Sequence, residues 1–160
     1  MNVKAIGTAM AAIAVIAMLV APIVMADNVD YSATVRTGQS TSVTASDGAF
    51  GEILQNTAKT ITDSVNLSNS GDWDANVEAK FTTNVSSIYG LVNGTNIIGG
   101  GNFTLGPTGS LVSLNNDGTD VQVATVNASE DKNLDAKLTV PSGQTAAIYN
   151  GTVLLTFSNV

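Results

Sequence analysis

Six asparagines in this chain stand in Asn-x-Ser/Thr triplets, which is the acceptor sequence for N-linked glycans. The triplet matters only in an exported chain, where a glycan can be attached to a surface asparagine. If the chain is exported, we therefore expect a glycoprotein. The candidate glycosylation sites are Asn66, Asn84, Asn93, Asn102, Asn127 and Asn150.

Two short acidic runs could offer oxygen ligands to a metal ion. Asp72, Asp74 and Asn76 alternate along the chain and would share one face of a strand, whereas Asp117 and Asp120 stand among turn-forming residues. Calcium takes about six to eight oxygen ligands, and neither run has the acid-rich loop with a distal glutamate that supplies them. We expect no bound metal; if one binds, the four aspartates are its candidate ligands. Otherwise they form a solvated strand face and a hairpin turn.

The residue types that most enzymes need are missing. The chain has no histidine and no cysteine, which excludes a Ser-His-Asp triad, a thiolate nucleophile, a zinc finger and a disulfide framework. Its 13 acidic residues form no recognisable catalytic pair, and the glycines at 99–101 are not followed by the Lys-Ser/Thr of a phosphate loop. We expect no catalysis, no cofactor and no small-molecule substrate.

Composition indicates an exported β protein. Six basic residues against 13 acidic ones, with a net charge of −7, disfavour a nucleic-acid surface because phosphate binding needs clustered Lys and Arg. Charged residues make up only 12% of the chain, and Asn, Ser, Thr and Gly occupy the other polar positions. Hydrophobic residues make up 44%, which argues against disorder.

The first 26 residues have the order of a secretory signal. Lys4 precedes an apolar run over residues 9–20, Pro22 interrupts that run, and compact residues lead up to Ala26. We expect cleavage between Ala26 and Asp27, with the mature chain of residues 27–160 secreted to the extracellular space or cell surface. Membrane contact is then limited to the signal segment before cleavage.

Two alternatives to this cleavage stay open. A cut before the apolar run, as in archaeal prepilins, would keep that run as a helix, and Lys4-Ala5 resembles such a site. The stretch from Ile6 to Ala26 is also about long enough to stay as an uncleaved membrane anchor. All three outcomes place residues 27–160 outside the cell.

Apolar and polar residues alternate along most of the mature chain, as in half-buried strands. Alternation is clearest over residues 29–35, 60–67, 73–81, 134–140 and 152–157. Trp73 has the same phase as Val77 and Phe81, so we expect it in the core rather than on the surface as a platform for sugar. The one helical candidate is Phe50–Asn56.

Turn-forming sequences separate these segments. Asn-Ser-Gly-Asp at 69–72 and Asn-Asn-Asp-Gly at 115–118 are strong turns, and about eight or nine short strands result. The sequence therefore predicts an all-β fold, a single Ig-like or jelly-roll-like antiparallel β-sandwich over residues 27–160.

Two stretches carry a resemblance to known proteins. Ile61–Phe81 (ITDSVNLSNSGDWDANVEAKF) resembles an Ig-like pair of strands joined through Asn-x-Gly-Asp, and Leu138–Phe157 (LTVPSGQTAAIYNGTVLLTF) resembles the closing hairpin of secreted bacterial and archaeal β-sandwich domains. A signal followed by one cysteine-free sandwich resembles the subunits of archaeal bundling pili and sheaths and of bacterial TasA-like fibres. The resemblance implies that a strand from one subunit completes the sandwich of the next.

We therefore expect a structural subunit of an extracellular filament, sheath or surface layer, with identical subunits as partners. The first mature strand is the candidate donor, and Gly38 with the Ser/Thr-rich stretch up to Asp47 could act as its hinge. Docking of this strand on its own domain stays open, and so does a different role, a secreted adhesion module for carbohydrate or a partner protein. The interface candidates are Val29, Tyr31, Ala33 and Val35.

Overall fold

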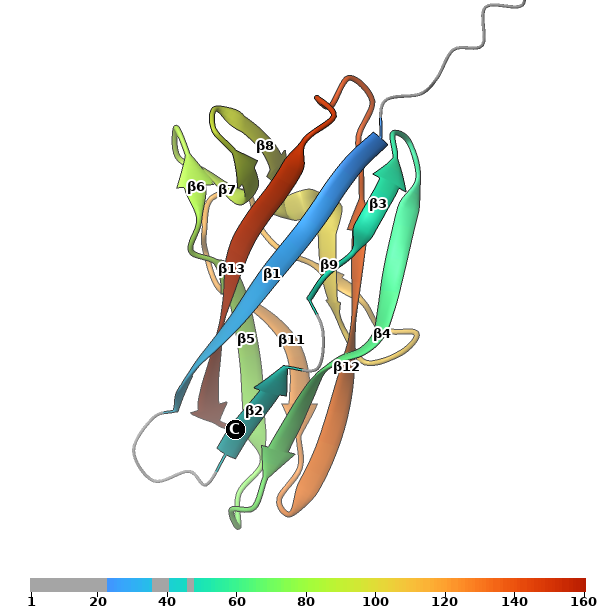
Figure 1. Cartoon of the computed structure of the whole chain (residues 1–160). Coiled ribbons are helices and arrows are strands. Elements are labelled where there is room, and N and C mark those ends of the chain that lie inside the picture. Colours follow the sequence, from blue (N-terminus) through green and yellow to red (C-terminus); the bar gives the residue numbers. More distant parts are fainter. Residues whose placement is uncertain (1–22, 36–40, 46–47) are drawn as a thin grey trace, which may run out of the picture.

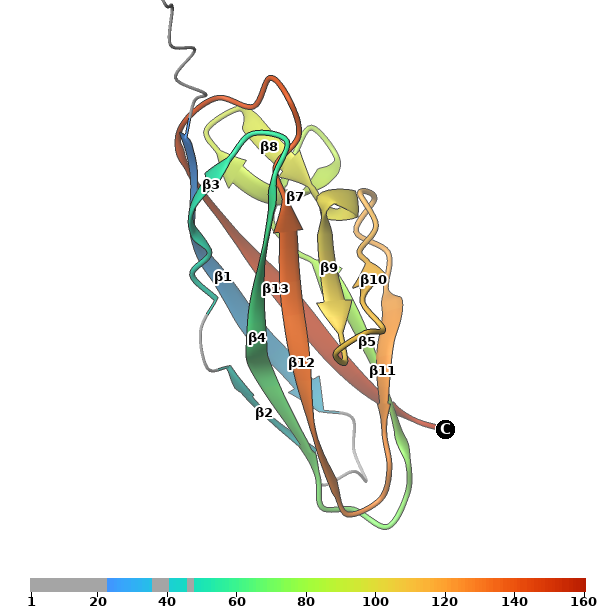
Figure 2. The same cartoon turned by 90° about the vertical axis from the view of Figure 1, so that its right-hand side faces the viewer.

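The computed structural model describes residues 23–35, 41–45 and 48–160, with the backbone alone for residues 23–28 and 32–35. Within these residues, thirteen strands form two sheets that pack face to face (Figure 1). The view along the sheets separates the two layers (Figure 2). The predicted all-β sandwich is confirmed. The strands outnumber the eight or nine expected because several are only two to four residues long.

The first sheet has eight strands, and the main path through it contains five of them. That path runs β11 (Val121–Val126), β5 (Ala75–Phe81), β13 (Ile148–Asn159), β1 (Ile23–Val35) and β3 (Gly51–Leu54). A small group made of β6 (Asn84–Val85), β7 (Ile88–Asn93) and β8 (Asn96–Gly99) joins the sheet where β7 meets β13.

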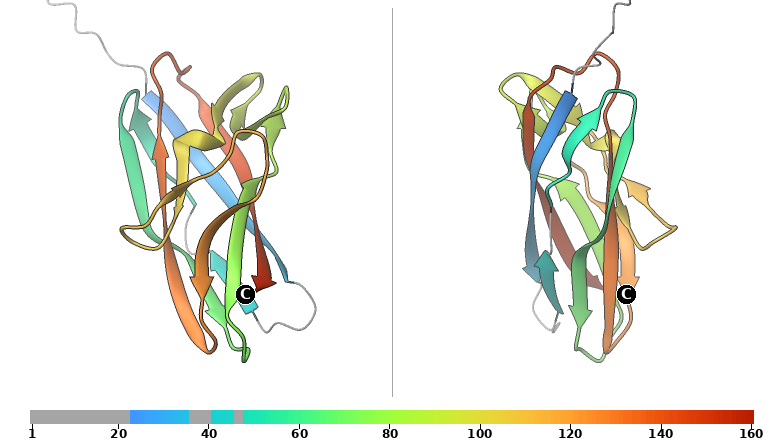
Figure 3. Two further views of the ribbon diagram at one scale, coloured as in Figure 1. Left: turned by 180° about the vertical axis from the view of Figure 1, so that it is seen from behind. Right: turned by 45° about the vertical axis from the view of Figure 1, so that its right-hand side comes forward.

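The second sheet has five strands in the order β10 (Val112–Ser113), β9 (Phe103–Gly106), β12 (Glu130–Thr139), β4 (Ala58–Asn69) and β2 (Thr41–Ala45). A short 3-10 turn over Gly100–Asn102 precedes β9. Every described strand pair is antiparallel except one, the parallel pair of β1 with β13. Figure 3 shows β1 and β13 running side by side in the same direction.

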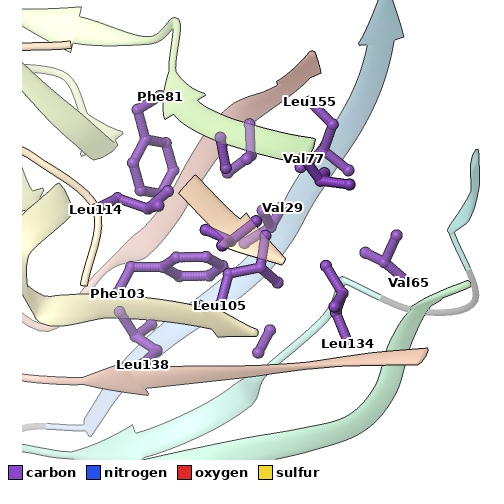
Figure 4. Packing of buried hydrophobic residues seen from close by; sticks show 14 of the residues in the cluster. Val29, Val65, Val77, Phe81, Phe103, Leu105, Leu114, Leu134, Leu138 and Leu155 are labelled. Atoms are coloured by element: carbon purple, nitrogen blue, oxygen red, sulfur yellow. The ribbon is translucent and has the colours of Figure 1, made fainter. Parts of the chain in front are cut away.

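The predicted alternation forms the core between the sheets. Along β5, the side chains of Ala75, Val77, Ala79 and Phe81 are buried, and their neighbours on the strand are partly exposed. Phe103 packs edge-to-face against Phe81 at 5.2 Å and against Phe50 at 6.0 Å between ring centroids. Figure 4 shows Phe103 lying between residues of both sheets. Burial of one face of each strand is the term that holds the two layers together.

The expectation that Trp73 lies in the core is wrong. Its side chain is 69% exposed, and β5 begins two residues later at Ala75. The alternating phase continues through Trp73 in sequence, but the chain there is still in the turn that crosses between the two sheets. A turn residue has no fixed inward face, so periodicity did not predict its exposure correctly.

The expectation of a helix over Phe50–Asn56 is also wrong. Residues 51–54 form β3, in which Ile53 is buried and Glu52 and Leu54 are exposed. β3 pairs antiparallel with the first four residues of β1, and a tight turn with Asn56 at φ +58° leads into β4. Pairing with a distant strand therefore outweighs the local sequence preference.

Candidate functional site

The expected interface strand lies in the chain's own first sheet. C-terminal to Asp27, β1 pairs in parallel with β13, from Asn28 opposite Asn150 to Val35 opposite Phe157. Val29 is buried and Tyr31 packs partly buried against the core. Ala33 lies opposite Leu155 in the backbone register. In the single chain, the strand thus adopts the second of its two alternatives, docking on its own domain.

A β-bulge divides β1 at Asp27. The ladder with β13 shifts between Ala26 and Asn28, so the register skips Asp27. N-terminal to the bulge, residues 23–26 pair with β3 on one side, and Met25 and Ala26 pair with β13 on the other. The expected cleavage bond, between Ala26 and Asp27, therefore falls at the boundary between the two parts of the strand.

C-terminal to the bulge, β13 is the one described strand that pairs with β1. The Val29 amide also donates a hydrogen bond to the Gly48 carbonyl at 3.1 Å. Residues 30–35 contain a single charged side chain, Asp30, and no lysine or proline. Charged residues and proline are the usual means of keeping an edge strand from pairing with another chain.

The hinge predicted after this strand is partly wrong. Thr41–Ala45 forms strand β2 and pairs regularly with Val65–Asn69 of β4, so these residues are held in the second sheet. The remainder of the predicted hinge, residues 36–40 and 46–47, lies outside the described residues. A connection from β1 to β2 through residues 36–40 is the segment that would have to permit strand exchange.

Four of the six candidate glycosylation sites gather at one end of the sandwich. Asn84 and Asn93 lie on β6 and β7, Asn102 lies in the 3-10 turn, and Asn150 lies near the start of β13. This is the end that carries β6, β7 and β8 in Figure 1. Asn84 and Asn150 are exposed, and Asn93 and Asn102 are partly exposed. The sequence offered no signal for this clustering.

The other two glycosylation candidates lie elsewhere. Asn66 is partly exposed on β4, where its side-chain amide donates to the Asn133 side chain at 2.7 Å. Asn127 is exposed directly after β11, in the turn that leads to β12. All six candidates therefore have at least part of the side chain in solvent.

Among the described residues, the candidate metal ligands Asp72, Asp74 and Asp120 do not converge on one point. Asp74 accepts a hydrogen bond from the Ala128 amide at 2.9 Å, Asp72 is exposed in the same turn, and Asp120 forms an ion pair with Lys80 at 3.0 Å. Within the described ranges, no group of three or more acidic side chains could hold a metal ion.

Asp117 closes a turn of its own. Its carboxylate accepts hydrogen bonds from the Thr119 hydroxyl at 2.7 Å and from the Thr119 amide at 3.0 Å. The hydroxyl bond first, and the amide bond after it, lower the pKa of Asp117 below its ordinary value of 3.8, because both donors stabilise the ionised form. These bonds close a turn, but the predicted hairpin is wrong, because the turn connects β10 of the second sheet to β11 of the first and the two strands do not pair.

A shallow hollow of about 230 Å³ lies at the opposite end from the glycosylation cluster. It is lined by hydroxyl, amide and carboxylate side chains, namely Ser68, Asn69, Ser70, Ser129 and Asp131. The turn that starts at its rim carries the exposed Trp73. The sequence prediction missed this hollow because its residues come from the end of β4 and the start of β12, with the adjoining turns, and these segments are far apart in the chain.

A buried carboxylate, Asp135, was also missed. It is 5% exposed, and its two oxygens accept hydrogen bonds from the Thr108 hydroxyl at 2.7 Å and from the Asp63 amide at 3.0 Å. The β4–β12 ladder shifts register at this point, and Asp63 has φ +52°. Asp135 therefore holds a bulge and a loop in place, and both oxygens are occupied by these contacts.

The sequence matches no protein-family model, and no curated protein matches it. Among residues 23–35, 41–45 and 48–160, no helix is long and apolar enough to cross a membrane.

Proposed function

We propose that the chain is exported, processed between Ala26 and Asp27, and built as a structural subunit into an extracellular filament, sheath or surface layer. Identical subunits join through β-strand complementation, with the N-terminal strand as the donor. The observation that carries this proposal is the position of β1. C-terminal to the bulge, residues 28–35 of β1 pair with β13 alone among the described strands.

Exchange of such a strand changes few interactions. A neighbour's β1 that enters beside β13 restores the same parallel ladder and buries the same side chains, as in domain swapping. A fully buried Val contributes about 1.5–3 kcal/mol, so the burial of Val29, together with the partial burial of Tyr31, favours refilling of the groove. The main-chain hydrogen bonds set the direction and register of the incoming strand.

The surface supports close packing of copies. Only 12% of the residues are charged, so repulsion between neighbouring subunits is small. Resemblance to archaeal pilus and bacterial fibre subunits supports the same proposal by analogy.

Deletion of residues 27–36 from the processed chain tests the proposal. We expect the full processed chain to form ordered filaments or sheets by electron microscopy and the truncated chain to stay monomeric. Addition of a synthetic peptide of residues 27–36 should restore the circular dichroism spectrum of the truncated chain without restoring polymers. Polymers of the truncated chain as abundant as those of the full chain would contradict strand donation.

A second candidate is a secreted binding module for carbohydrate, and the surroundings of Trp73 favour it. Exposed aromatic rings stack on sugars, and hydroxyl, amide and carboxylate groups hydrogen-bond to them. Trp73 is 69% exposed and belongs to the turn at the rim of the polar hollow. Titration with polysaccharides by isothermal titration calorimetry tests this function, because Trp73 is the single tryptophan and its fluorescence is lost in the variant. A discrete monomer that binds a polysaccharide, with loss of binding in Trp73→Ala but not in Val112→Ala, would favour the binding module.

A further inference from the structure

The N-terminal part of β1, residues 23–26, lies between β3 and the start of β13. We call the space that these four residues occupy the slot. Residues 23–26 pair antiparallel with all four residues of β3, from Ile23 opposite Leu54 to Ala26 opposite Gly51. On the other side, Met25 and Ala26 pair in parallel with the first residues of β13. A four-residue strand is about 13 Å long, and cleavage after Ala26 would remove this whole length.

The slot has an apolar rim and lies over the core. Leu54 on β3 and Ile148 on β13 flank it, and they are 47% and 43% exposed even with residues 23–26 in place. Ile53, opposite Val24, is buried at 3%. Removal of the intervening strand would leave backbone groups of Gly51–Leu54 without their ladder partner, which is unfavourable.

The bulge lets the slot open without release of the rest of β1. Since the ladder is interrupted at Asp27, residues 28–35 keep their register with β13 whether or not residues 23–26 are attached. The first residue of the processed chain, Asp27, then lies at the bulge and outside the slot. The chain's own N-terminus therefore cannot refill the slot while β1 stays docked.

From this arrangement we infer that residues 23–26 are a plug, and that their removal opens an acceptor slot between β3 and β13, where the N-terminal strand of a second copy first pairs before it replaces the resident β1 beside β13. The inference rests on the proposed function. It adds the step that controls assembly, which is the removal of residues 23–26. The entering strand must run parallel to β13 and antiparallel to β3. The N-terminal strand of this chain already takes that direction beside β13 and alternates apolar with polar residues.

The plug makes assembly depend on processing. An unprocessed copy has its acceptor slot filled from within the same chain, and it remains closed to other copies. After cleavage, the slot is a place where an incoming strand can hydrogen-bond on both sides, since β3 and β13 lie one strand apart among the described strands of the first sheet.

The experiment compares the processed chain, residues 27–160, with a chain that retains residues 23–26. The probe is a synthetic peptide of residues 27–35, and the readout is amide hydrogen exchange at Gly51–Leu54 by NMR. We expect the peptide to slow exchange there at least about tenfold in the processed chain and to leave the plugged chain unchanged. Protection in neither chain, or equal protection in both, would overturn the plug.

Substitutions of the apolar residues at the rim of the slot test whether the peptide binds there. Leu54→Glu and Ile148→Glu should each weaken peptide binding by about tenfold, because a carboxylate would replace an apolar contact at the slot. Val112→Glu is the matched control, since Val112 is 36% exposed on β10 in the other sheet and should leave binding unchanged. Circular dichroism confirms that each variant is folded. Equal effects of all three substitutions would refute the slot.

The failure of this inference and that of the proposed function can be told apart. If both chains polymerise equally well, the plug is refuted and the structural function stands. If the peptide binds the processed chain at the slot but no polymer forms, the slot stands and the structural function is refuted.

Discussion

Asn69 is the residue on which the end of the sandwich opposite the glycosylation cluster depends most. It lies at the end of β4 and is only 2% exposed. Its side-chain amide faces the carbonyl oxygens of Trp73 at 2.8 Å, Asn127 at 3.1 Å and Val126 at 3.2 Å, and its own carbonyl accepts from the Gly71 amide at 3.1 Å. One side chain thus ties the β4–β5 turn to the β11–β12 turn.

The contribution of Asn69 to the free energy of unfolding follows from the number of hydrogen bonds that its side chain can make at once. An amide nitrogen carries two hydrogens, so about two of the three carbonyls are bonded at once, and the bond from Gly71 makes about three. Each bond contributes about 1 kcal/mol net. We expect Asn69→Ala to lower the free energy of unfolding by about 3 kcal/mol and the melting temperature by about 10 °C.

Asn69→Asp is the sharper variant because its shape is unchanged. An ionised carboxylate accepts hydrogen bonds but donates none, so at neutral pH it faces three carbonyl oxygens and is repelled. The folded state should then raise the pKa of this new carboxyl. Its destabilisation is full above that pKa and shrinks as the pH falls through it, because the protonated acid can donate again.

Urea denaturation followed by far-UV circular dichroism measures both variants against the natural chain at each pH. We expect Asn69→Asp to be less stable than Asn69→Ala at pH 7 and the difference from the natural chain to narrow towards pH 4. Loss of less than about 0.5 kcal/mol in Asn69→Ala would show that water replaces these bonds and would refute the reasoning.

Three further outcomes follow from the same structure. Trp73→Ala should change the free energy of unfolding by no more than about 0.5 kcal/mol, since the ring is exposed, and a blue-shifted, quencher-resistant emission from Trp73 would contradict that exposure. Phe103→Ala should cost about 3–5 kcal/mol in urea denaturation, because the ring fills the core; a cost below 1 kcal/mol would be inconsistent with that packing. Thr119→Val should raise the pKa of Asp117 in an NMR titration, because it removes the hydroxyl bond that lowers it, whereas an unchanged pKa would show that this bond does not form. The stabilisation from that bond is present above the ordinary aspartate pKa and disappears as the pH falls through the lowered one.

Alternation along the chain predicted which side chains of β5 and β13 form the core. Val77 and Phe81 on β5, and Val153 and Phe157 on β13, are buried as their spacing predicts. A strand places every second side chain on the same face, so a local pattern carries this information. The same rule failed at Trp73, because the pattern does not reveal where the strand ends and the turn begins.

The tertiary structure alone decided how distant segments meet. The parallel pairing of β1 with β13, the bulge at Asp27 and the pairing of residues 23–26 with β3 each join segments that are far apart in the chain. Asn69 likewise draws together two turns separated by more than fifty residues. Strand register and turn-to-turn hydrogen bonds depend on which segments become neighbours after folding, and no local preference of the chain encodes that choice.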